Sequence, residues 1–278
     1  MMESTKHSAD AALDAGNRNI DPITLIAMSV VVVLACSFLH EAVGHTGMAT
    51  TLGVKVVRIT SSYARQRDAT ETQARFIAAA GIPVNLLFGV AAVAYARFRT
   101  RDEHDSMHYF LWLFGYTSIL SGANYMVGFA FLQVGDVNMI VRGLPNESVW
   151  RSGIMVAGLI LMRVAWYFAA KTFIRFVGGE ENMRRRGALL TVVPYLVMGC
   201  VSTGTAVVFH DGSLPFWLVL LSAGGSTFGS NSFLLWMNLF LRKSGTAPTL
   251  SLPRNTGWIG TGVVCLLLFC LLARGIDF

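Results

Sequence analysis

The chain has 278 residues and a formal net charge of +6; 54% of its residues are hydrophobic and only 14% are charged. Soluble domains carry roughly 25% charged residues, so this composition excludes an ordinary soluble domain and predicts a protein embedded in a lipid bilayer. Basic residues in a membrane protein report its orientation first, so the positive charge does not indicate a nucleic-acid partner. We expect no nucleic-acid role.

The chain opens with a polar tail, residues 1–21, in which we find no cleavable signal peptide. Seven apolar stretches follow that are long enough, or nearly long enough, for a membrane helix of about 20 residues. They cover residues 22–45, 76–98, 109–141, 153–170, 188–209, 214–241 and 257–273. We therefore expect an all-α integral membrane protein with about seven transmembrane helices, of which the third and the sixth are long enough to tilt or break.

Between the first two stretches, the β-branched residues of Val54–Thr60 follow a glycine and predict a short membrane-associated strand or hairpin. The loops leave no room for an inserted soluble domain of the usual size. We divide the rest of the chain into a core of three spans, 22–145, and a C-terminal membrane region of about four spans, 146–278. In that region, the small residues of Gly224–Asn231 predict a helix break or a close packing surface.

Four histidine or acidic side chains fall within the apolar stretches: His40, Glu41, His45 and Asp136. Such groups are costly inside a bilayer and are usually functional where they occur. Two histidines and a carboxylate can hold a catalytic zinc ion with one position left for water, while a second carboxylate acts as base. We predict one Zn²⁺ per chain, with His40, His45 and Asp136 as ligands and Glu41 as catalytic base. Alternating spans place these residues and Asn85 on one side of the membrane.

The spacing of the two histidines requires a distorted helix. His40 and His45 are five residues apart, which separates them by about 140° around a regular α-helix. A π-bulge absorbs one residue and brings such positions onto one face, and Gly44 could instead let the helix unwind. We expect one of these two distortions.

At these residues the chain resembles the site-2 protease family of intramembrane zinc metalloproteases. The family pattern is a His-Glu-x-x-His helix, a Gly-Val-Lys-Val-like strand, a Gly-Pro-x-x-Asn motif and an aspartate in a later span. The chain has His40–His45 with one extra residue, then Leu52–Val56, then Ala80–Asn85, then Asp136. It departs from the pattern at Pro83, which stands one place late, and in the residues that flank the aspartate.

The resemblance implies a zinc-dependent intramembrane endopeptidase that hydrolyses a peptide bond in a membrane-anchored protein substrate. It implies that Val54 and Val56 lie in a strand that pairs with the unwound substrate, and that Asn85 holds a substrate carbonyl. It also implies a multi-pass protein of the cell membrane whose site opens to the cytoplasm. The basic residues of the loops weakly favour the opposite orientation, and here we follow the resemblance.

Other interpretations stay open. A descendant could keep the fold without peptidase activity and act as a membrane binding or regulatory protein. A transporter is less favoured because no internal repeat is apparent. At single residues, His40–His45 could be a polar helix end at the membrane interface, and Asp136 could pair with Arg163 instead of a metal ion.

Overall fold

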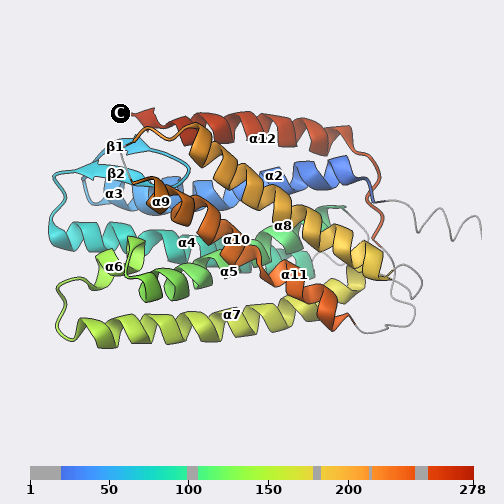
Figure 1. Cartoon of the computed structure of the whole chain (residues 1–278), viewed down its shortest axis with the longest axis horizontal. Helices are drawn as coiled ribbons and strands as arrows, with labels where there is room; N and C mark the ends of the chain where they lie inside the picture. The colour runs from blue at the N-terminus through green and yellow to red at the C-terminus, as the bar shows by residue number, and fades with distance from the viewer. Residues whose placement is uncertain (1–19, 99–105, 178–182, 213–214, 242–249) are drawn as a thin grey trace, which may run out of the picture.

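The computed structural model describes residues 20–98, 106–177, 183–212, 215–241 and 250–278. Almost all of the predicted polar tail lies outside these ranges. Long helices run side by side along the longest axis of the molecule, and a small sheet lies at one end of them (Figure 1). The fold is thus mainly helical, as expected.

Six long α-helices lie within the described ranges: α2 (Pro22–Phe38), α4 (Glu71–Phe98), α5 (Ser106–Leu132), α7 (Glu147–Val177), α8 (Met183–Val208) and α12 (Thr256–Arg274). The first continues through the π-helix η1 (Leu39–Thr46) into α3 (Gly47–Thr51), and α5 is followed by the short α6 (Gly135–Val141). Another helix is assembled from shorter pieces: α9 (Phe216–Val219), η2 (Leu220–Gly225), α10 (Ser226–Asn231), α11 (Phe233–Met237) and the 3-10 turn η3 (Asn238–Phe240).

Within the described ranges, six helices are long and apolar enough to cross a membrane: Pro22–Thr51, Glu71–Phe98, Glu147–Val177, Met183–Val208, Phe216–Met237 and Thr256–Arg274. This corrects our expectation of about seven, because α5 has the length of a span without the composition. The helix packs against α2, α4, α7 and α10. Neighbouring helices therefore cover it, and polar side chains such as Thr117 and Ser118 can be buried in contacts between helices.

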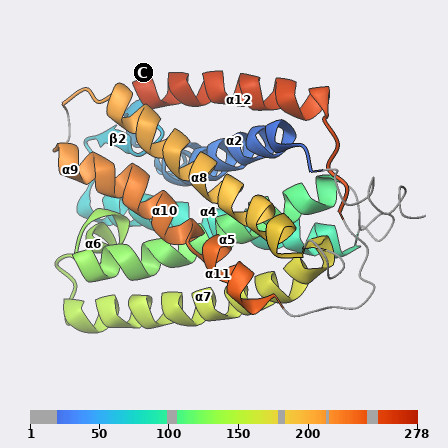
Figure 2. The ribbon, with the colours of Figure 1, turned by 45° about the vertical axis from the view of Figure 1, so that its right-hand side comes forward.

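The two long apolar stretches that we expected to tilt or break behave differently. The stretch 109–141 is broken: its long helix ends at Leu132, and α6 begins at Gly135, whose φ of +62° suits a residue without a Cβ. The stretch 214–241 is distorted but not broken, because the π-helix η2 runs directly into α10, and a Cβ at Gly224 would lie 2.9 Å from Thr203 Oγ1. The small-residue run thus packs closely and lies where the helix is distorted. α10 lies between α8 and α5, as Figure 2 shows.

The sheet confirms the predicted hairpin and adds a strand that the sequence did not predict. β1 (Lys55–Ile59) pairs antiparallel with β2 (Ala64–Arg67). The C-terminal strand β3 (Ile276–Asp277) pairs with the other side of β1 through Arg58 and Ile59. The order β2-β1-β3 makes β1 the central strand. β2 keeps one edge with no strand partner in the described part of the chain.

Glycines set the spacing of α4, which carries Asn85, and of α5, which leads into α6 and Asp136. A Cβ at Gly89 would lie 2.7 Å from the carbonyl oxygen of Gly115, and one at Gly122 would lie 3.1 Å from Leu86. Small residues at such positions let two helix backbones approach closely. The contact holds the end of α5, and α6 after it, beside the π-helix η1.

Candidate metal centre

The two histidines come together because the helix that carries them is π-helical. η1 extends from Leu39 to Thr46 and joins α2 and α3 without a break. The imidazole rings of His40 and His45 lie 4.7 Å apart between centroids and are perpendicular to each other. The wider turn of a π-helix absorbs the extra residue between them. The expected distortion is confirmed, and it is the π-bulge rather than local unwinding at Gly44.

Two glycines let α4 support this segment. A Cβ at Gly44 would lie 2.6 Å from Gly81 Cα, so the backbones of η1 and α4 are in contact there. A Cβ at Gly81 would lie 2.6 Å from Cε1 of His40. The imidazole therefore occupies the space in which any other residue at position 81 would place its side chain.

Asp136 completes the cluster from α6. Its Oδ2 lies 3.1 Å from Nε2 of His40 and 3.4 Å from Nε2 of His45. Two ligand atoms that share a tetrahedral zinc ion at about 2.0–2.1 Å lie roughly 3.3 Å apart. Asp136 Oδ2 thus lies at the spacing from each histidine nitrogen that a shared metal ion would require, and the three side chains come from two separate helices.

His45 is oriented by a further hydrogen bond. Its Nδ1 lies 2.7 Å from the carbonyl oxygen of Ile77. A carbonyl oxygen can only accept, so Nδ1 carries a proton, and the neutral ring would present the lone pair of Nε2 to a metal ion. Metal-binding histidines usually make this kind of contact through the nitrogen that does not bind the metal.

Glu41 adds a second carboxylate to the same place. His40, Glu41 and His45 are all buried, and one ligand atom from each lies within 4.8 Å of the others, so this His-Glu-His group could hold a metal ion. Either carboxylate can complete a site with the two histidines. Asp136 Oδ2 lies within 3.4 Å of a ring nitrogen of both imidazoles, whereas Oε2 of Glu41 is buried without a hydrogen-bond partner among the described residues. These contacts favour Asp136 as the candidate ligand and Glu41 as the candidate base.

A cavity of about 520 Å³ gives access to the cluster, a volume typical of ligand-binding sites. All four predicted metal-site residues line it, together with parts of β2, α4, α6 and α9. Its walls combine polar side chains, such as Gln66 and Gln133, with large apolar ones, such as Phe129 and Trp217. Such walls suit an amphipathic ligand larger than water.

The structure places Asn85 beside the cluster, as predicted from the alternation of spans. The residue lies half-way along α4, is 1% exposed and lines a small pocket with His40 and Glu41. Its backbone carbonyl accepts a hydrogen bond from Ser118 Oγ, while its side-chain Oδ1 has no partner. A polar group left in this state is available to a ligand.

Val54 and Val56 lie elsewhere. Val54 precedes β1 and packs with Ile77 in a small apolar cluster against which Val56 also packs. Neither valine lines the cavity that contains the metal-site residues. The strand residues that do line it, Ala64 and Gln66, belong to β2.

Arg163, the alternative partner of Asp136, contacts another side chain. The Arg163 guanidinium lies 5.8 Å from the ring centroid of Trp166 on α7, whereas the Asp136 carboxylate faces the two histidines.

Sequence reasoning also missed Tyr125, whose ring lies 4.4 Å from that of His40. No spacing in α5 indicates this contact, which depends on how the helices pack.

Comparisons with protein-family models, with curated proteins and with solved structures gave no match to this chain. The described residues establish a mostly helical fold, six helices apolar enough to cross a membrane, and a buried His-Glu-His group that could bind a metal ion. The chemistry of the site follows from its own side chains.

Proposed function

We propose that this chain is a multi-pass membrane protein and a zinc-dependent intramembrane endopeptidase. The observation that carries the proposal is the convergence of His40, His45 and Asp136 beside buried Glu41, at the wall of a cavity of about 520 Å³. The membrane assignment is supported by the outward faces of α7 and α12, where large side chains such as Ile160 and Leu267 are exposed. In water these faces would form apolar patches of unusual size.

The donor set suits zinc. Two imidazoles and one carboxylate are the protein ligands of several catalytic zinc sites, and they leave a coordination position open. Zinc bound there would polarise a peptide carbonyl and make water a stronger nucleophile. His45 is already held in the tautomer that presents Nε2, because its Nδ1 donates to the Ile77 carbonyl.

Glu41 would move the proton. As general base it takes a proton from the attacking water, and it then gives that proton to the amine nitrogen that leaves when the peptide bond breaks. Its Oε2 makes no hydrogen bond within the protein and is therefore available for this exchange. Asn85 lines the small pocket that it shares with Glu41 and not the larger cavity, so its side-chain amide would reach a substrate carbonyl only through that pocket.

A substrate segment needs backbone partners once its helix is unwound, because water is scarce at this depth. We assign that role to β2 in place of the strand around Val56. β2 has an edge without a strand partner, and Ala64 and Gln66 of β2 face the cavity. An extended peptide can add to such an edge through main-chain hydrogen bonds.

The proposal is tested by zinc content and peptide cleavage in the purified full-length protein. We expect close to one zinc per chain and cleavage of a membrane-anchored reporter in the wild type. Glu41→Gln should keep the zinc and reduce cleavage by about 10²–10⁴-fold. The matched variant Asp136→Asn should lose zinc as well as cleavage.

The other outcomes decide between the remaining interpretations. If the wild type binds no zinc, the metallopeptidase proposal fails. If zinc binds but no membrane-anchored reporter is cut, the protein is a metal-binding membrane protein that has lost peptidase activity. If Glu41→Gln also loses zinc, Glu41 is a ligand and the assignment of the base is wrong.

A further inference from the structure

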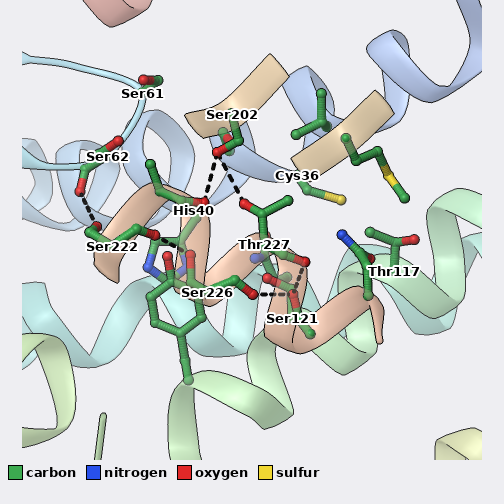
Figure 3. Close-up of a pocket in the computed structure, with 18 of the residues that line it drawn as sticks. Cys36, His40, Ser61, Ser62, Thr117, Ser121, Ser202, Ser222, Ser226 and Thr227 are labelled. Carbon is green, nitrogen blue, oxygen red and sulfur yellow. Dashed lines mark hydrogen bonds between the residues drawn. The ribbon is translucent and has the colours of Figure 1, made fainter. Parts of the chain in front are cut away.

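A second, smaller pocket lies behind the metal centre, on the side of the C-terminal helices. It has a volume of about 40 Å³ and is lined by residues of α2, η1, α4, α5, α8, η2 and α10, and by Ser61 and Ser62 between β1 and β2. His40 and Glu41 line both this chamber and the larger cavity. Many of the side chains that line it carry hydroxyl groups, as Figure 3 shows for Ser202, Ser226 and Thr227.

Four residues that line this chamber each carry a buried polar atom with no hydrogen-bond partner in the described part of the chain: Glu41 Oε2, Asn85 Oδ1, Thr117 Oγ1 and Asn231 Oδ1. Each of these residues is 4% exposed or less. Leaving such an atom unpaired in a protein interior is costly. Four such residues around one small space indicate that the space holds partners for them.

The neighbouring hydroxyls define what that partner must offer. Ser202 Oγ donates to the Ala223 carbonyl, Thr227 Oγ1 donates to Ser202 Oγ, and Ser230 Oγ donates to the Ser226 carbonyl. Their protons are already used, so these oxygens present lone pairs. Two of the four unpaired atoms are amide oxygens, which can also only accept. The chamber therefore needs a ligand rich in donors.

We propose that the chamber is a binding site for a small cluster of ordered water molecules. A water molecule occupies at least about 10–15 Å³ of such probe-filled volume and makes 2–4 hydrogen bonds, so about 40 Å³ holds two or three molecules. Those molecules would donate hydrogen bonds to the unpaired side-chain oxygens of Asn85, Asn231 and Glu41. The small polar residues of α8 and α10 would then bind water, a role that no sequence motif predicts.

The position of the chamber links it to catalysis. A substrate in the larger cavity would cover Glu41 from one side, and the chamber would keep this carboxylate hydrated from the other. The bound water would then replace the molecule consumed in each hydrolysis. This use of the chamber rests on the proposed function, whereas the water cluster itself does not.

Hydroxyl-radical footprinting with a short X-ray pulse tests the proposal, because radicals formed from bound water oxidise side chains that bulk solvent cannot reach. Met198 lines the chamber, Met28 lies in the apolar core, and both are 0% exposed. In the full-length protein in nanodiscs, we expect methionine sulfoxide to form at Met198 at least several times faster than at Met28. Equal rates would overturn the proposal.

A variant provides the second readout. Asn231→Leu fills part of the chamber with an apolar side chain and should bring the oxidation rate of Met198 close to that of Met28. Zinc content, measured in the same sample, should stay at the wild-type level. Undiminished oxidation of Met198 in this variant would contradict the proposal. If Met198 is oxidised in a wild type that binds no zinc, the chamber stands and the peptidase proposal falls.

Discussion

Gly81 packs directly against the imidazole of His40. A Cβ at this glycine would lie 2.6 Å from Cε1 of the ring and 2.8 Å from each ring nitrogen. Real Cβ atoms do not approach other atoms so closely, so the ring can hold its position only while residue 81 has no side chain. The Gly-x-x-x-Asn segment of α4 thus supports the cluster in two ways: Gly81 leaves room for the His40 ring, and Asn85 lies beside it.

Gly81→Ala should therefore weaken metal binding. We expect the zinc affinity to fall by about 10–100-fold, the range found when groups that orient a metal ligand are changed. Competition with a chromophoric chelator measures it. Gly153→Ala is the matched control: a Cβ there meets nothing within 4 Å, and alanine is favoured over glycine in a helix by roughly 1 kcal/mol. Unchanged affinity in Gly81→Ala would show that His40 is not a ligand.

Deleting Val43 should be tolerated by the metal site. The deletion changes the histidine spacing from five residues to four, which a regular α-helix places about 40° apart, so the π-bulge is no longer needed. We expect zinc content close to the wild type. Inserting one alanine after Val43 is the opposite change and should abolish zinc binding. If the deletion also loses zinc, the wide turn is needed for more than convergence of the two rings.

Removing the metal should destabilise the protein reversibly. A ligand that binds only the folded state adds about 2.7 kcal/mol at a hundredfold excess over its Kd. Treatment with a chelator should therefore lower the thermal unfolding temperature of the detergent-solubilised wild type, and added zinc should restore it. His45→Ala should show neither response. A zinc-dependent shift that survives in this variant would place the metal elsewhere.

Gln66→Ala should affect substrate binding more than Arg65→Ala. Gln66 lines the cavity, whereas its neighbour Arg65 is exposed and does not line it. If a peptide adds to the edge of β2, we expect Gln66→Ala to raise KM for a membrane-anchored reporter about tenfold and Arg65→Ala to leave it within twofold. Zinc content controls for damage to the metal centre. Equal KM values in both variants would argue against β2 as the docking strand.

Much of the site follows from local sequence properties. Charged groups are costly in apolar segments, so His40, Glu41, His45 and Asp136 stand out without a structure. The five-residue spacing required a π-bulge because the geometry of a helix is local, and η1 has this form. The β-branched residues that follow Gly53 likewise indicated a short strand or hairpin.

Other features depended on contacts between distant segments, which no local pattern encodes. The burial of α5 among its neighbours lets it be more polar than a lipid-facing helix, so hydropathy over-counted the spans. Pairing of β3 with β1 made the predicted docking strand the central one and left β2 at the edge.

The sequence by itself determined which ionisable groups lie in apolar stretches and how the helix that carries two of them must turn. Only the tertiary structure decided that Asp136 faces these histidines, that Gly81 makes room for His40, and that α8 and α10 line a polar chamber behind Glu41. The physical reason is that helix geometry and the cost of burying charge depend on neighbouring residues in the chain. Cavities and ligand sets depend instead on which surfaces of separate helices meet.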